Sequence, residues 1–497
     1  MVWWRRRSIS HDENEEPRTD WRSIYVLALV AFISNVHSQI IGPAMWPYMK
    51  LLIPGVSENF FGLLNSLVAI GSVLSSPIAG YISNYLRDTT WPLLTSKMFA
   101  ITSCFIYLTI ELVGVKAKYA LFIVVELIFG FSVGTSYTYR TFVAMESTEL
   151  DRAKAVAIWH VTYSSNFNNL APTLAIFVGP LLQLLFGLLG YPGASLLFGL
   201  HLNLYTAPLY TIVLICIIGL VLLICSFDGR MRLYKQVKAK QPVSDTQLDA
   251  NSTSSEDHIG YDKLAFCVCL YTRMLVNFCA MCINIVVIPY SMITFRWTSE
   301  KTTLYISISM VLIGINICFW NFLYIFSNIK NRLKERTGIF IAICLVLLAY
   351  LLTYPYPFIG GSIPYIDPTD NSTEPLGCKP EFKWCAETPR VNMYLFLGSL
   401  IIVLGMAVPL CEINLNILAS KVLGNIKQGT LQSFMNISAD ILTIFSPILF
   451  TKVYTLSGPK YLWLLQIGIL SISLILWLIC FKRMVGKSER LTTVQND

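Results

Sequence analysis

Charged residues are scarce in this sequence. Asp, Glu, Lys and Arg make up 13% of its 497 residues, whereas they make up about 25% of a typical soluble domain. The sequence also lacks the closely spaced Cys and His residues of a metal site and any nucleophile constellation, since its five histidines are scattered. These shortages exclude an ordinary soluble domain and argue against an enzyme. We expect no bound metal and no other cofactor.

Long apolar runs take the place of the missing charge. Apolar residues make up 55% of the chain and fall in recurrent runs of about 20 or more, enough to cross a hydrocarbon core about 30 Å thick as helices. The runs lack the alternation of apolar and polar residues that marks the strands of a membrane barrel. The sequence therefore predicts an all-α membrane protein whose surroundings are the lipid bilayer.

Twelve such runs can be placed, six in each half of the chain. Their expected bounds are 22–48, 60–86, 92–114, 118–142, 154–188 and 206–227, then 263–293, 302–328, 337–354, 391–418, 426–453 and 461–481. We predict an N-terminal six-helix half over residues 22–227 and a C-terminal six-helix half over residues 263–482. The polar segment 228–262 between them is interpreted as a flexible cytosolic linker.

The basic residues predict the orientation in the membrane. The net charge is +8, and Lys and Arg cluster before the first run and after the sixth, eighth and twelfth runs, which lie on one side if the runs alternate. By the positive-inside rule that side is the cytosol, so the tails 1–21 and 483–497 are both cytosolic. The charge thus reflects topology and gives no reason to expect a nucleic-acid partner. The first twenty residues lack the features of a signal peptide, so we expect the first helix to be retained.

A long polar loop at residues 355–390 is predicted to lie outside the cytosol. Cys378 and Cys385 lie together in this loop, and a local disulfide between them is our hypothesis. The other eleven cysteines fall in apolar runs, where a thiol usually behaves as a small hydrophobe. Asn371 begins an Asn-Ser-Thr triplet in the same loop, and we expect it to be N-glycosylated.

A landmark recurs in both halves. Pro180 lies in the fifth run and Pro447 in the eleventh, and a Gly/Pro-marked loop follows each, at 190–193 and 458–459. A single proline is most often a tolerated kink, but its recurrence at matching positions indicates a parallel repeat. Transporters built from two such halves bind their substrate between the halves.

Short motifs along nearly the whole chain carry a family resemblance. They are Trp21 to Tyr25, Trp46 to Tyr48, Ser76 to Ile78, Ser83 to Tyr85, Arg140, Ala144, Thr148, Arg152, Gly179-Pro180, Asn203 to Pro208, Pro409, Cys411, Lys421, Gln428-Gly429 and Gly458-Pro459. In order and spacing they resemble the lysosomal major facilitator superfamily domain-containing protein 8 family, also called ceroid-lipofuscinosis neuronal protein seven. The resemblance implies a twelve-transmembrane-helix major facilitator superfamily fold and a lysosomal or late endosomal membrane, with the plasma membrane as the alternative.

Ionisable residues inside the runs are the candidates for the transport path, because a charge exposed to lipid is costly and needs a partner or an aqueous cavity. They are His37, Glu126, Arg273 and Glu412, on the first, fourth, seventh and tenth runs. The resemblance implies that these four helices line the path. Buried ion pairs that brace the helix bundle are the structural alternative.

Arg273 lies about ten residues into its run, roughly 15 Å along the helix and near mid-depth. Its guanidinium stays charged there and needs a carboxylate, water or an anionic substrate. We hypothesise that it provides the positive site for an anion, with Glu126 or Glu412 competing for it and coupling proton movement. In the family this run has a carboxylate five residues before a proline, whereas here Asn284 precedes Pro289, so proton coupling does not carry over to that position.

Four further residues are candidates for gating or bracing. The facilitator signature after the second run has an Asp where this chain has Asn84 and a Gly where it has Arg87. Arg87 can latch neighbouring helix ends or anchor the chain at the cytosolic interface, and the two readings weigh equally. Arg140 lies near the cytosolic end of its run, where it can snorkel, and for Asp440 we favour bracing.

Two function classes stay open. The first is a lysosomal or endosomal transporter that moves a small solute, with an anion such as chloride as one candidate, by alternating access or by channel-like conductance. The second is a transport-inactive membrane receptor or trafficking scaffold on the same fold. Tyr261 and Leu264 belong to a segment similar to a tyrosine-based sorting signal. The sequence names neither the solute, the direction of flux nor the oligomeric state.

Overall fold

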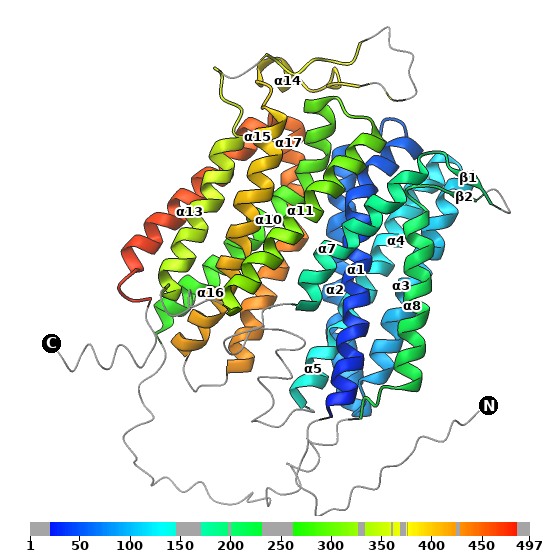
Figure 1. The fold of residues 1–497 in the computed structure, drawn as a ribbon, viewed down its shortest axis with the longest axis vertical. Helices are drawn as coiled ribbons and strands as arrows, with labels where there is room; N and C mark the ends of the chain where they lie inside the picture. Colours follow the sequence, from blue (N-terminus) through cyan, green and yellow to red (C-terminus); the bar gives the residue numbers. More distant parts are fainter. Residues whose placement is uncertain are drawn as a thin grey trace, which may run out of the picture.

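Long helices that run side by side make up most of the described chain (Figure 1). The computed structural model describes residues 20–145, 170–196, 200–230, 262–326, 333–358, 361–367, 374, 376–423 and 428–484. Within these residues the sheet structure is a short hairpin, in which β1 (Ala194–Ser195) pairs antiparallel with β2 (His201–Leu202). The described fold is thus almost entirely α-helical.

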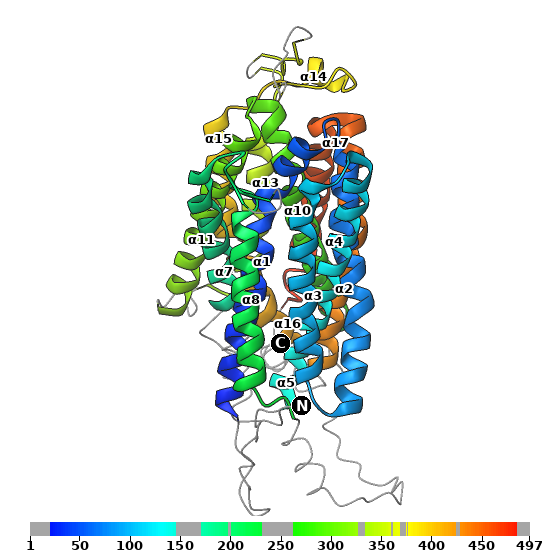
Figure 2. The ribbon, with the colours of Figure 1, turned by 90° about the vertical axis from the view of Figure 1, so that its right-hand side faces the viewer.

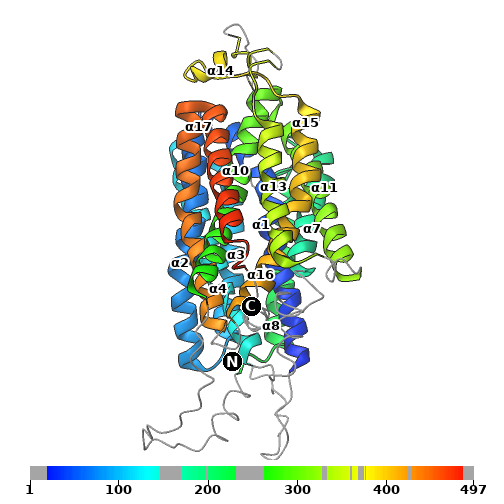
Figure 3. The ribbon, with the colours of Figure 1, turned by 90° about the vertical axis from the view of Figure 1, so that its left-hand side faces the viewer.

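Two groups of helices divide the molecule. The N-terminal half holds α1 (Trp21–Leu52), α2 (Glu58–Leu86), α3 (Thr90–Thr109), the 3-10 turn η1 (Ile110–Leu112), α4 (Val115–Ser136), α5 (Thr138–Met145), α7 (Leu170–Phe186), the 3-10 turn η2 (Gly187–Leu189) and α8 (Ala207–Cys225). The C-terminal half holds α10 (Lys263–Phe295), α11 (Ser299–Phe326), α13 (Glu335–Thr353), α14 (Trp384–Glu387), α15 (Met393–Gly398), the π-helical turn η4 (Ser399–Leu404), α16 (Gly405–Leu423) and α17 (Gln428–Cys480). Figure 2 views the molecule from the N-terminal half and Figure 3 from the C-terminal half.

Ten helices of the described residues are long and apolar enough to cross a membrane. The last of them contains two crossings, because α17 is broken at Gly458, and α7 adds a shorter apolar helix. These additions bring the total to twelve. The predicted all-α, twelve-helix membrane fold is therefore confirmed.

The helices form where a buried backbone must satisfy its own hydrogen bonds, and their ends coincide with capping residues. Asp262 Oδ1 accepts the backbone N–H groups of Leu264 and Ala265 at the start of α10, at 2.9 and 3.2 Å. Ser57 Oγ accepts the N–H of Phe60 at the start of α2, at 3.3 Å. Polar capping residues therefore mark where α10 and α2 begin.

Two details differ from the predicted spans. The predicted span 118–142 is divided, since α4 ends at Ser136 and α5 begins at Thr138. The predicted loop at 458–459 is shortened to a single-residue turn inside α17: Gly458, with φ 78° and ψ 177°, reverses the chain between two antiparallel crossings, and Pro459 has no N–H to continue the helical ladder. A Cβ at Gly458 would lie 2.7 Å from the Trp384 ring, so this ring packs directly on the turn.

The halves meet through the helix pairs α2–α17, α7–α11 and α1–α11. Glycines allow the backbones to approach closely. A Cβ at Gly62 of α2 would lie 2.3 Å from Thr451 Oγ1 of α17, and one at Gly314 of α11 would lie 3.0 Å from Phe177 of α7. In Figure 1 the loop that carries α14 covers one end of the bundle, here called the α14 end, and α5 lies at the opposite end.

Candidate functional site

A cavity of about 800 Å³ lies between the two halves. Its walls come from α1, α2, α3 and α4 on one side and from α10, α11 and α17 on the other. Gln39, Asn65 and Asn284 contribute polar groups, and Met281 and Met310 contribute apolar surface. The cavity therefore offers a mixed polar and apolar surface to a small solute, and we call it the central cavity.

Glu126 is the one charged side chain among the described residues that line the central cavity. It is 6% exposed and lies on the same face of α4 as Gly130 and Gly134, because the three are spaced by four residues. This face packs tightly on α2, since a Cβ at Gly130 would lie 2.4 Å from Val68 O and one at Gly134 would lie 2.3 Å from Ser72 O. The packing of α4 on α2 fixes Glu126 at the cavity wall, where it can bind a proton or a cationic group.

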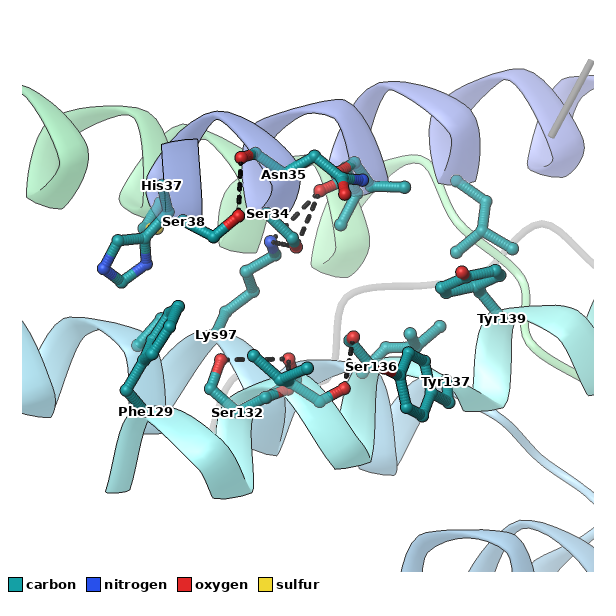
Figure 4. Close-up of a pocket in the computed structure, with 18 of the residues that line it drawn as sticks. Ser34, Asn35, His37, Ser38, Lys97, Phe129, Ser132, Ser136, Tyr137 and Tyr139 are labelled. Carbon is teal, nitrogen blue, oxygen red and sulfur yellow. Dashed lines mark hydrogen bonds between the residues drawn. The ribbon is translucent and has the colours of Figure 1, made fainter. Parts of the chain in front are cut away.

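A smaller cavity of about 270 Å³ lies within the N-terminal half, between α1, α3 and α4 (Figure 4). It adjoins the central cavity, because both are lined by Ser38, Val68, Phe129, Val133 and Tyr137. His37 lies at the smaller cavity and is buried, with its Nε2 3.6 Å from Cys104 Sγ and its ring centre 4.5 Å from that of Phe129. Two of the four predicted transport residues, His37 and Glu126, thus face adjoining spaces.

Lys97 of α3 is a buried cation that the sequence reasoning missed. It is 2% exposed and lines the smaller cavity. Its Nζ donates to Val30 O of α1 at 3.1 Å and to Ser34 Oγ of the same helix. The signal was present, since Lys97 is the one charged residue between 92 and 110. A lysine near the end of an apolar run can also reach the interface, and only the packing of α1 over it shows that it does not.

The other two predicted transport residues form an ion pair within the C-terminal half. Arg273 of α10 donates through Nη1 to Glu412 Oε2 of α16, and the two side chains are about a quarter exposed. Neither residue lines the two cavities described above, and Glu126 is not part of the pair. The structure therefore brings Arg273 together with one of its two predicted partners.

Three of the gating and sorting candidates, Asn84, Arg87 and Leu264, line neither cavity. Asn84 and Arg87 are exposed at the end of α2, where Arg87 has φ 50° and its backbone N–H caps the helix on Ser83 O. Leu264 is exposed in the first turn of α10. Arg140 belongs to α5 and Asp440 to α17, whereas Asn371 and Tyr261 lie outside the described residues.

The α14 end holds a second polar cluster that the sequence reasoning did not find. The loop that covers this end holds the Cys378–Cys385 disulfide, which the sequence analysis did predict. The neighbouring Lys379 reaches the N-terminal half, where its Nζ lies 3.0 Å from Glu58 Oε1 and 3.1 Å from Val56 O. The Glu58 side chain is 3% exposed. A buried ion pair thus joins the two halves at this end.

Two further contacts cross between the halves at the α14 end. Glu300 Oε1 of α11 accepts the backbone N–H of Tyr191 at 2.8 Å, and Thr455 Oγ1 of α17 lies 3.4 Å from Asn59 Oδ1 of α2. These polar contacts and the Lys379–Glu58 pair tie the halves together above the central cavity.

A family model of the Major Facilitator Superfamily matches residues 27–447. The chain belongs to the major facilitator superfamily. It is therefore a multi-pass membrane protein and a secondary transporter of a small solute, not an enzyme. The superfamily assignment also confirms the fold implied by the sequence motifs.

Similar proteins agree with this assignment. Major facilitator superfamily domain-containing protein 8 of Xenopus laevis is 21% identical over 509 aligned residues, covering 96% of this chain and 94% of that protein. This likeness confirms the predicted resemblance. The crystal structure of the human organic anion transporter MFSD10 covers 92% of this chain and 99% of its own, with a TM-score of 0.55 and 16% identity. The structure of the inward open xylose transporter XylE from E. coli covers 91% of this chain and 94% of its own, with a TM-score of 0.59 and 13% identity. These two structures share the fold.

Proposed function

We propose that this chain carries a small solute across a lysosomal or endosomal membrane by alternating access, and that the solute is an anion such as chloride or a molecule with an anionic group. The observation that carries the proposal is the central cavity of about 800 Å³, whose walls come from both halves. Alternating access rocks one half against the other around a site at their interface. A cavity with one wall on each half is the arrangement that this motion requires.

The contacts at the α14 end support a gated carrier over a channel-like conductance. The Lys379–Glu58 ion pair joins the halves there, and the α1 segment 43–49 and the α10 segment 285–295 are buried beneath it. In our proposal the α14 end faces away from the cytosol, while both chain termini and the linker 228–262 are cytosolic. The two halves, 22–227 and 263–482, are then the bodies that rock, and the form described here is closed on the non-cytosolic side.

Charges around the path support an anionic solute with a proton as partner. Lys97 lies beside the central cavity and can attract a negative group. Glu126, within the cavity, repels an anion unless it has bound a proton. We therefore propose that an anion and a proton bind together. Arg273 could serve an anion only if the anion displaced Glu412 from it.

A flux measurement tests the function. Purified full-length protein in liposomes is expected to move chloride or a small carboxylate, with faster uptake when a proton gradient points in the same direction. Glu126→Gln should remove the effect of the proton gradient, because an amide does not titrate. Glu381→Gln, an exposed carboxylate in the loop at the α14 end, should behave like the parent. Absence of flux in folded protein would reject the proposal and favour the transport-inactive receptor.

The compartment rests on the resemblance to the protein 8 family and on the segment around Tyr261. Fluorescence microscopy is expected to place the full chain on lysosomes or endosomes, and Tyr261→Ala should shift it to the cell surface. Surface residence of the parent chain would reject the destination, and lysosomal residence of Tyr261→Ala would reject the sorting role of the motif.

A further inference from the structure

A buried ammonium in the N-terminal half has no carboxylate partner among the residues that the structure describes. No ion pair of the described residues includes Lys97, whose Nζ contacts only two neutral oxygens, Val30 O and Ser34 Oγ. An ammonium has three N–H donors, so one donor is left over by these two contacts. Burial of an unpaired charge is costly, and neutral oxygens offset only part of that cost. Lys97 therefore retains the capacity to bind a negative group.

The space beside Lys97 is large enough and polar enough to hold such a group. It measures about 270 Å³, and its described lining contains no acidic residue. The amide of Asn35 and the hydroxyls of Ser132 and Ser136 line it (Figure 4), and so does the hydroxyl of Ser96. Ser96 Oγ donates to Ser132 O at 2.8 Å, so part of this lining is held in place by hydrogen bonds. The cavity thus combines the Lys97 ammonium with walls that hold hydroxyl and amide groups among apolar side chains.

We infer that this smaller cavity is an anion-binding site in which the Lys97 ammonium holds a small inorganic anion or the carboxylate of an organic solute. The five lining residues that it shares with the central cavity give an anion bound there a direct way to the interface between the halves. Arg273 is the weaker candidate, since Glu412 already neutralises it. Only the role of the bound anion as transported solute rests on the proposed function, because binding can be measured without flux.

Thermal unfolding of the purified full-length protein tests the site. Chloride or acetate is titrated at constant ionic strength, with sodium HEPES as the balancing salt. At an anion concentration ten times the dissociation constant, the unfolding midpoint of the parent is expected to rise by about 1 °C. A response to chloride alone identifies a site for an inorganic anion, and a response to acetate identifies a carboxylate site. No response to either anion would overturn the inference.

Substitutions then locate the response. Lys97→Met should abolish the anion-dependent rise and Lys97→Arg should retain part of it. Lys118→Met is the matched control, because Lys118 also donates to a backbone carbonyl of α1, Leu52 O at 3.3 Å, but lines neither cavity. A rise that persists in Lys97→Met, or that is lost in Arg273→Gln instead, would overturn the inference.

Two further comparisons keep the outcome clear. If Lys97→Met does not fold, Ser136→Leu should reduce the rise by filling the cavity while keeping the ammonium, and an unchanged rise in that variant would reject the site. A parent protein that binds the anion but shows no flux in liposomes would reject the proposed function and leave the binding site standing. Flux without any anion-dependent rise would reject the binding site and leave the proposed function standing.

Discussion

Replacement of Lys379 by methionine is expected to open the α14 end. Methionine keeps an unbranched apolar chain but removes the ammonium that contacts both oxygens of Glu58, at 3.0 and 3.3 Å. Because the Glu58 side chain is 3% exposed, its charge would stay buried without a partner, at a cost of about 3–5 kcal/mol in the closed form. If Glu58 meets water in the open form, a cost of about 3 kcal/mol shifts the equilibrium between the two forms by about a hundredfold.

Labelling of a cysteine in the central cavity measures this shift. Asn65→Cys, on the cavity wall, is exposed to a membrane-impermeant maleimide from the α14 side of oriented vesicles, and the parent with Asn65 corrects for native cysteines. Lys379→Met should accelerate labelling. Lys383→Met, an exposed lysine of the same loop, should not. Combining Glu58→Gln with Lys379→Met should bring the rate back towards that of the parent, because no charge is then left unpaired.

The result that refutes this reasoning is specific. If Lys379→Met reaches the membrane in normal amounts and labels no faster than Lys383→Met, the ion pair does not hold the two halves together. The same conclusion follows if the double substitution labels as fast as the single one, because the effect would then not depend on the charge of Glu58.

Three further substitutions probe other parts of the chain. Arg273→Ala should lower the unfolding midpoint more than the double substitution Arg273→Ala with Glu412→Gln. In the single variant the partly buried Glu412 carboxylate loses its partner, at a cost of about 1–3 kcal/mol. Loss of flux at normal stability would instead support an anion site at Arg273. Asn371→Gln should increase gel mobility and remove glycosidase sensitivity, and unchanged mobility would reject the glycosylation site. Gly458→Ala should lower the unfolding midpoint, because φ 78° costs a non-glycine residue about 1–2 kcal/mol. Gly468→Ala, with open space at its Cβ, should not. Equal midpoints of the two variants would contradict this account of the turn.

Hydropathy was sufficient to predict the fold because each crossing is a local property of about twenty residues. The same locality limited the details. Gly458-Pro459 was correctly recognised as the break between two crossings, but the ring that packs on this turn, Trp384, comes from a loop more than 70 residues earlier. Local patterns thus indicated where helices break, but not which distant residues pack on the break.

The site could be predicted only in part. The depth of a residue in the membrane follows from its position in an apolar run, but its interaction partner depends on how the helices pack. Glu126 and Arg273 were found by their depth, yet depth does not tell that one lines a cavity and the other pairs with Glu412, 139 residues away. The Lys379–Glu58 contact spans 321 residues and joins a surface loop to a helix start, positions at which a charge is unremarkable in a sequence. Such pairs become visible only when the helices are packed.

The close contact of α2 with α4 has a consequence for how the transporter can move. At Gly130 the three atoms nearest to a Cβ would be backbone atoms of α2, and at Gly134 they would be Ser75 Oγ and two backbone atoms of Ser72. Such direct packing makes sliding of α2 past α4 costly. A displacement that keeps these contacts must therefore move α2 and α4 together, and it carries Glu126 with them.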